Sequence, residues 1–168
     1  HNVICRNKPD KIVIRGFLQM ARRMIVKIGE DILRKKCKEV TEFDASLGEL
    51  LDDMKETMLD ADGVGLAGPQ VGVLRRVAVV SPNGKNFYEF VNPVIVSSSG
   101  AQICREGCLS VPGINGEVER PKKIEVMAYD RNGRRFQLKA EGVLANICCH
   151  EFDHLDGILF IDKMMGKR

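Results

Sequence analysis

The segment His150-Glu151-Phe152-Asp153-His154 constrains this chain more than any other, because it matches the pattern His-Glu-x-x-His. On a helix, residues i and i+4 lie on one face, so both imidazoles can reach one metal ion. Glu151 then lies beside the metal, where its carboxylate can accept a proton from water. The flanking apolar residues follow helical spacing, and Asp156-Gly157 marks the expected helix end. The sequence therefore predicts a metal-binding helix, although the bare pattern also occurs on solvated helices with two ordinary histidines.

A third metal ligand is expected upstream of this motif. Catalytic zinc-type sites usually have three protein ligands and one open position. Phe160 stands where one class of metallopeptidase has a third histidine, and the 14 residues after His154 offer only Asp156 and Asp162 as acids. Cysteine thiolates bind such metals well. Cys108 stands out among the six cysteines, because it lies between a β-like run and a Pro-Gly turn.

Three motifs taken together resemble those of the peptide deformylase family. They are Gly63-Val64-Gly65-Leu66-Ala67-Gly68-Pro69-Gln70, then Glu106-Gly107-Cys108-Leu109-Ser110, then the His-Glu-x-x-His segment at 150–154. Each motif alone is weak to moderate, but their order and spacing together are highly specific. The chain departs from the family pattern at Gly68, where alanine is more common, and at Cys149, where glutamine is common.

This resemblance implies a metal-dependent hydrolase that removes the N-formyl group from the formyl-methionine of newly made polypeptides and releases formate. It implies that Cys108, His150 and His154 bind the metal and that Glu151 is the general base. It also implies that the Gln70 side chain and the Leu109 backbone N–H donate to the oxyanion. Close approach of a peptide to the glycine-rich segment, with an apolar slot for methionine, implies substrate-binding residues at Val64, Gly65, Glu106, Gly107, Leu144 and Ile147, with Cys148 a further candidate for the slot. Glu106 and Arg120 are expected to form a buried pair that supports the cysteine loop.

The expected cofactor is one divalent metal ion. A cysteine and two histidines are compatible with Fe(II), Zn, Ni or Co. The resemblance favours Fe(II) as the native ion, with Zn, Ni or Co alternatives in isolated protein.

Three other interpretations of the motifs remain open. A His-Glu-x-x-His zinc endopeptidase would need a downstream ligand that the sequence lacks. A closed structural metal site would have no use for Glu151 and Gln70. An inactive deformylase-like protein stays open because of Gly68 and Cys149.

The order of predicted elements indicates the α+β class, with antiparallel sheets packed around the C-terminal metal-binding helix. A capping box at Ser46 and Glu49 predicts a helix to about Asp60, and 30–38 is expected to form a loop or one helical turn. The predicted strands cover 76–80, 87–91, 94–96, 101–109, 117–120, 124–129 and 135–140, with a hairpin turn at 130–133.

Residues 24–168 are expected to form one catalytic domain, because Met24 resembles a natural start. Residues 1–23 are expected to be a non-native or disordered extension, with a targeting segment as the alternative. The net charge of +3 depends on this extension, whose removal leaves 20 basic and 22 acidic residues. The domain therefore gives no electrostatic case for specific nucleic-acid binding, and no apolar run approaches membrane-spanning length.

The cysteines read as reduced thiols, which favours a bacterial-type cytoplasmic location, or an organellar one if 1–23 is a targeting segment. The expected partners are N-formylated nascent peptides, with transient ribosome association.

Overall fold

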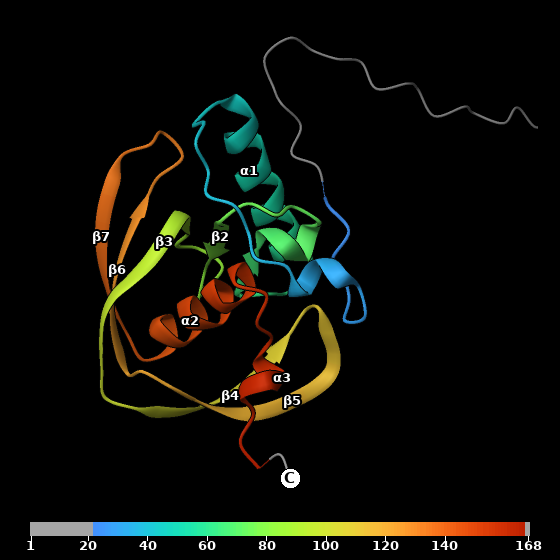
Figure 1. The fold of residues 1–168 in the computed structure, drawn as a ribbon, viewed down its shortest axis with the longest axis vertical. Coiled ribbons are helices and arrows are strands. Elements are labelled where there is room, and N and C mark those ends of the chain that lie inside the picture. The colour runs from blue at the N-terminus through green and yellow to red at the C-terminus, as the bar shows by residue number, and fades with distance from the viewer. Residues whose placement is uncertain (1–21, 167–168) are drawn as a thin grey trace, which may run out of the picture.

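The computed structural model describes residues 22–166, in which two helices pack against opposite faces of a five-stranded antiparallel sheet (Figure 1). The extension predicted at 1–23 lies outside the described residues except for its last two. The elements in chain order are the 3-10 helix η1 (Asp31–Arg34), α1 (Ala45–Asp60), β1 (Gly65–Ala67), the 3-10 helix η2 (Gly68–Val71), β2 (Val77–Val80), β3 (Tyr88–Ser99), β4 (Gln102–Cys108), β5 (Val111–Arg120), β6 (Lys123–Tyr129), β7 (Arg135–Glu141), α2 (Val143–Leu155) and α3 (Phe160–Lys163).

The sheet has the order β1-β2-β3-β6-β7, and β2 is buried on both of its faces. Side chains alternate across a strand, so one strand can serve two cores. Ala78 and Val80 pack with the apolar face of α2, whereas Val77 and Val79 pack with that of α1. The uniformly apolar sequence of β2 follows from this position between two helices.

The β4–β5 hairpin forms a separate two-stranded sheet that curves below α2 (Figure 1). A third, smaller core joins this hairpin to η1 and α3 through Leu33, Val111, Val118, Leu159 and Phe160. Helix α2 is therefore enclosed by the large sheet on one side and approached by the hairpin on the other. The prediction of an α+β fold with antiparallel sheets around the metal-motif helix is confirmed.

The start of α1 differs from the prediction. The N-cap is Asp44, whose extended backbone lets its carboxylate accept a hydrogen bond from Leu47 N–H at 3.0 Å. The capping box predicted at Ser46 and Glu49 is therefore wrong, because both residues already lie inside the helix. The predicted end at Asp60 is correct.

The predicted strands 87–91 and 94–96 are one strand, β3, with irregular pairing to β6 between Val91 and Val94. Asn92 has a left-handed backbone there (φ 51°), and its side chain bonds both the N–H and the carbonyl of Val40. The short elements β1, η2 and α3 were not predicted, because each is too short to show a hydrophobic period.

The segment that leads into the domain is held by specific contacts. Arg23 bonds Asp53 of α1 through its guanidinium and Thr57 through its backbone N–H. Further on, Val26 N–H donates to the Gln70 carbonyl and Ile28 N–H to the Ser110 carbonyl, both at 2.7 Å. In the part of the chain that the structure describes, no helix is long and apolar enough to cross a bilayer.

A cluster of charges joins α1 to the sheet. Glu89 of β3 receives hydrogen bonds from Arg131, in the β6–β7 turn, and from Lys55 of α1, and Arg131 also bonds Asp52. Burial alone would raise the pKa of Glu89, but these cations outweigh it and lower the pKa below its ordinary value. The ionised carboxylate of Glu89 therefore stabilises the folded protein.

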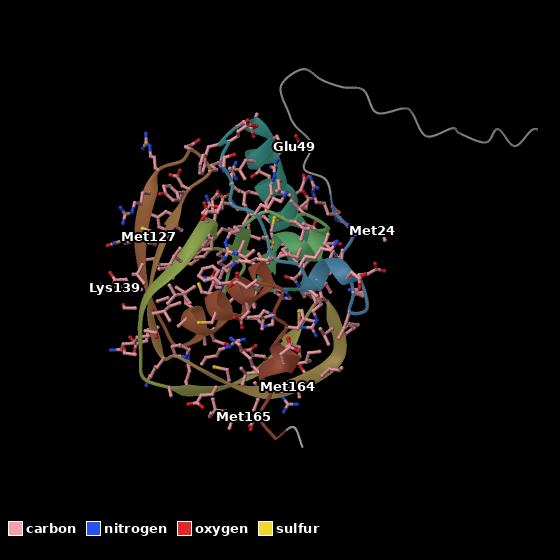
Figure 2. The ribbon with its side chains drawn as sticks, viewed as in Figure 1. Met24, Glu49, Met127, Lys139, Met164 and Met165 are labelled. Carbon is pink, nitrogen blue, oxygen red and sulfur yellow. The ribbon has the colours of Figure 1, made fainter. Side chains whose placement is uncertain are left out.

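We predict that Glu89→Gln destabilises the protein by about 1–2 kcal/mol near neutral pH, because its two charge-assisted contacts weaken. A lowered folded-state pKa contributes stability that is present above the unfolded pKa and lost as the pH falls through the folded value. The difference between the two proteins in urea unfolding should therefore be full above the ordinary carboxyl pKa and shrink as the pH falls below it, through the lowered folded-state pKa of Glu89. Glu49→Gln is the control, since Glu49 is an exposed α1 residue that makes no ion pair among the described residues (Figure 2). A difference that stays constant with pH would contradict this account of Glu89.

Candidate metal centre and substrate cleft

Helix α2 carries both motif histidines into the interior, as the sequence predicted. Glu151 and His154 are 3% and 1% exposed. The helix ends at Leu155, and Gly157 follows with φ +73°. A Cβ at Gly157 would lie 2.4 Å from the carbonyl oxygen of Arg34, so glycine is required where the chain passes η1.

Cys108, His150 and His154 come together at the end of β4 and along α2. One donor atom from each lies within 4.8 Å of the other two, and Cys108 Sγ is 3.4 Å from His154 Nε2. Ligand bond lengths of about 2.0–2.3 Å in a tetrahedral site put donors roughly 3.3–3.8 Å apart. The three side chains therefore need only small movements to share one ion.

Two polar atoms within the His-Glu-x-x-His motif have no hydrogen-bond partner among the described residues. They are Glu151 Oε2 and His154 Nδ1, and both are buried. Buried polar atoms normally have a partner. The free carboxylate oxygen of Glu151 fits the chemistry of a proton acceptor beside a metal, and the mixed sulfur and nitrogen donors fit a divalent transition metal.

Glu106 orients one of the histidines. Its Oε2 accepts a hydrogen bond from His150 Nδ1 at 2.8 Å, and both of its oxygens contact Arg120, at 2.7 and 3.0 Å. Burial would raise the pKa of Glu106, but the hydrogen bonds of His150 and Arg120 outweigh it and lower the pKa to about 2. The carboxylate stays ionised, and Nε2 of His150 is left to face Cys108.

The two histidines have opposite proton affinities. Burial lowers the pKa of His154 to about 3, so this imidazole is neutral, as a metal ligand must be. Burial also disfavours charge on His150, but hydrogen bonds to Cys108 and Glu106 outweigh it and raise its pKa to about 10. A metal ion would have to displace a proton from His150, so binding should release protons.

Burial also raises the pKa of Glu151 to about 7. A carboxyl group with a pKa near neutrality can both accept and return a proton under physiological conditions.

Gln70 is held by both ends of its amide. Its Oε1 accepts a hydrogen bond from Ala67 N–H at 3.0 Å, while its Nε2 lies 3.1 Å from Ser110 Oγ and 3.5 Å from Cys108 Sγ. Gln70 is 1% exposed, so its NH₂ group is fixed at the edge of the ligand set. The amide thus caps the local backbone and also presents a donor next to Cys108.

Gly65 lies directly against Glu151. A Cβ added at Gly65 would lie 2.4 Å from Glu151 Oε1, so only glycine lets the edge strand β1 approach this carboxylate so closely. Ser81 N–H donates to the Val64 carbonyl, which faces β2. Because backbone groups alternate along a strand, the N–H and carbonyl of Gly65 point away from β2, toward the cleft.

A cavity of about 360 Å³ opens over this centre. Of the residues expected to bind substrate, Val64, Gly65, Glu106, Gly107 and Ile147 line it. Leu144 does not line this cavity, because it is partly buried and packs against the core on the α2 side of the sheet, and Cys148 is fully buried in that core. The expected catalytic residues Gln70, Leu109 and Glu151 also line the cavity.

Three residues outside the sequence motifs also line the cavity and were not predicted to do so. Asp62 and Arg105 are exposed and line the cavity, and Asn146 lies on α2 one turn before His150. Asn146 had a detectable signal, since it shares the helical spacing of the motif. Asp62 and Arg105 had no such signal, because a charged residue outside a motif cannot be distinguished from an ordinary surface residue.

Comparisons with known proteins agree with this geometry. The sequence model of the family described as polypeptide deformylase matches residues 22–168. A peptide deformylase of Caldicellulosiruptor bescii is 57% identical over 146 residues, covering 87% of each chain. The crystal structure of a peptide deformylase from Legionella pneumophila superposes with a TM-score of 0.84 at 47% identity, covering 87% of this chain and 88% of that one. The Thermotoga maritima peptide deformylase gives a TM-score of 0.83 at 40% identity, covering 85% and 97%.

Proposed function

Because this chain belongs to the polypeptide deformylase family, and is a metal-dependent hydrolase that removes the N-formyl group from nascent polypeptides, we propose that Cys108, His150 and His154 hold its metal ion. The observation that carries this proposal is the convergence of one sulfur and two imidazole donors beside an unpaired buried carboxylate. The alternatives of an endopeptidase and an inactive relative are not favoured by the family comparisons.

We infer that Fe(II) is the native ion, and that Zn, Ni or Co can replace it in isolated protein. A donor set of one thiolate and two imidazoles suits each of these metals. The chemistry supplied by a bound divalent ion is Lewis acidity, which activates water as a nucleophile near neutral pH.

Glu151 acts as the general base in this proposal. It takes a proton from the attacking water and returns it to the departing amine nitrogen. Its burial, its free Oε2 and its pKa near 7 all suit that cycle.

Gln70 and Leu109 stabilise the developing oxyanion in the same proposal. The Gln70 amide and the Leu109 backbone N–H provide two donors near the ligand set, and each such donor is worth about 3 kcal/mol where it has been measured. Lys27 holds the loop by donating to the Leu109 carbonyl at 2.9 Å.

The substrate backbone is proposed to pair with the open edge of β1. The free N–H and carbonyl of Gly65 can bond an extended peptide, which would add a strand to the sheet. Val64 and Ile147 then form an apolar wall for the methionine side chain, while Glu106 and Gly107 bound the cleft on the side of β4.

Transient ribosome association and a cytoplasmic location remain parts of the proposal. They follow from the substrate, since nascent peptides carry the formyl group at the site of synthesis. The matched relatives from Caldicellulosiruptor, Legionella and Thermotoga support a bacterial-type setting.

We predict that Glu151→Gln lowers turnover by at least about a hundredfold, because the proton acceptor is removed. Metal content should stay close to that of the unaltered protein, since Glu151 is not a ligand in the proposed set. Turnover is measured as formate release from a formyl-Met peptide, with protein prepared anaerobically in Fe(II). Near-normal turnover in a correctly metallated variant would refute the general-base role.

Formyl-Met peptides should be hydrolysed at least about tenfold better than acetyl-Met peptides, because the space beside Gln70 and Leu109 has little room for an extra methyl group. Gln70→Ala should lower kcat more than it raises KM, because the oxyanion contact strengthens in the transition state. Gln137→Ala on the outer strand β7 is the matched control and should change neither constant. Equal rates on the two acyl groups, or cleavage inside an unformylated peptide, would overturn this view of the cleft.

A further inference from the structure

A network of four charged side chains, Lys163, Asp153, Arg120 and Glu106, connects the protein surface to His150. Lys163 of α3 bonds Asp153 at 3.0 Å, and Asp153 Oδ2 accepts from Arg120 Nη1 at 2.6 Å. Arg120 in turn holds Glu106, which accepts from His150 Nδ1. These four side chains are two carboxylates and two cations, so the network as a whole carries no net charge.

Arg120 connects the two elements that carry the ligand set. It lies in β5 of the hairpin whose other strand ends in Cys108, and it is 3% exposed. Arg120 bonds Asp153 of α2 directly, and it is connected to His150 of α2 through Glu106. These two attachment points are three residues apart on one side of the helix. Two contacts so spaced fix both the position and the rotation of α2 against the hairpin.

Asp153 is the residue of this network that lies on α2, and it is not a proposed metal ligand. It occupies one of the two variable positions of the His-Glu-x-x-His motif, immediately before His154. Without its carboxylate, Nη1 of Arg120 would lose its partner in a buried place, and buried donors without partners are strongly disfavoured. The guanidinium would then turn away from Glu106 or draw it from His150.

Helix α3 positions Lys163, the residue of this network that lies farthest from His150. Helix α3 lies beside the β4–β5 hairpin, close to Met164 (Figures 1 and 2). Phe160 of α3 belongs to the same small core as Val118 of β5, and Met164, next to Lys163, forms a β-bridge with Val118. Lys163 is thereby held at the end of the hairpin, within reach of Asp153.

We propose that Asp153 is a positioning residue that keeps Cys108, His150 and His154 in register through Arg120 and Glu106, and so sets how firmly the metal is retained. This inference rests on the ligand set proposed above. Asp153 is not among the residues that line the substrate cavity. Its loss should therefore speed metal release much more than it weakens substrate binding.

The test is the rate at which zinc leaves the zinc-loaded protein for an excess of a coloured chelator. Partners of metal ligands change metal affinity by about 10–100-fold when they are removed. Asp153 lies further out, so we expect Asp153→Asn to release zinc at least about fivefold faster and Asp153→Ala faster still. Asp153→Glu, which keeps the charge, should lie closer to the unaltered protein than Asp153→Asn does.

Asp156→Asn is the matched control. Asp156 is the C-cap of α2 and pairs with Arg76 at 2.9 Å, away from Arg120, so its substitution should leave zinc release unchanged. KM for a formyl-Met peptide should stay within about twofold in all variants, while kcat follows metal occupancy and recovers when metal is added. If Asp153→Ala does not fold, Asp153→Asn, with the same side-chain volume, decides the question.

Zinc release by Asp153→Asn within twofold of both the unaltered protein and Asp156→Asn would overturn the inference. The zinc assay needs no hydrolase activity, so its result is separate from the proposed function. Cys108→Ala tests the ligand set in the same assay, because zinc retention that does not depend on Cys108 would remove the basis of both proposals.

Discussion

The buried carboxylate of Glu106 is the interaction on which the organisation of the centre depends. It accepts hydrogen bonds from Arg120 and His150, and so joins the β4–β5 hairpin to helix α2 at the point where their donor atoms meet. Burying an ion pair is costly, and replacing one by apolar residues is often neutral for stability. The value of this pair therefore lies in geometry: it holds a thiolate from one element and two imidazoles from another within reach of one ion.

The rest of the fold supports this junction from two sides. Strand β2 is buried between α1 and α2, so the helix that carries His150 and His154 packs on a rigid sheet. The same sheet ends at β1, where Gly65 lies against Glu151 and leaves an edge free. One face of α2 is packed, whereas the sheet edge beside it is open. The candidate metal centre can therefore be buried and held in place while an extended peptide still reaches it.

Much of this was predictable from the sequence because it depends on local pattern. The helical spacing around His150 and His154 predicted α2, and Asp156-Gly157 predicted its end. The turn residues at 130–133 predicted the hairpin that joins β6 to β7. The convergence of Cys108 with the histidines followed from the donor chemistry. The pairing of Glu106 with Arg120 was also expected, and it is present at 2.7 Å.

Other features could not be predicted, because they depend on contacts between distant segments. Leu144 fits an apolar slot by its residue type, but the rotation of α2 leaves it partly buried and packed against the core instead of lining the cavity. Strand β1 is only three residues long, and its pairing with β2 cannot be seen in its own sequence. Asp153 carries no signal of its contact with Arg120, 33 residues away, because that contact exists only once the hairpin lies across the helix.

In the proposed centre, one metal ion is held by one sulfur from the β4–β5 hairpin and two imidazole nitrogens from α2. X-ray absorption spectroscopy of the metal-loaded protein counts these donors directly. We expect one sulfur and two imidazole nitrogens bound to the metal, with the sulfur lost in Cys108→Ala. A shell without sulfur, or one with two or more sulfurs, would contradict it.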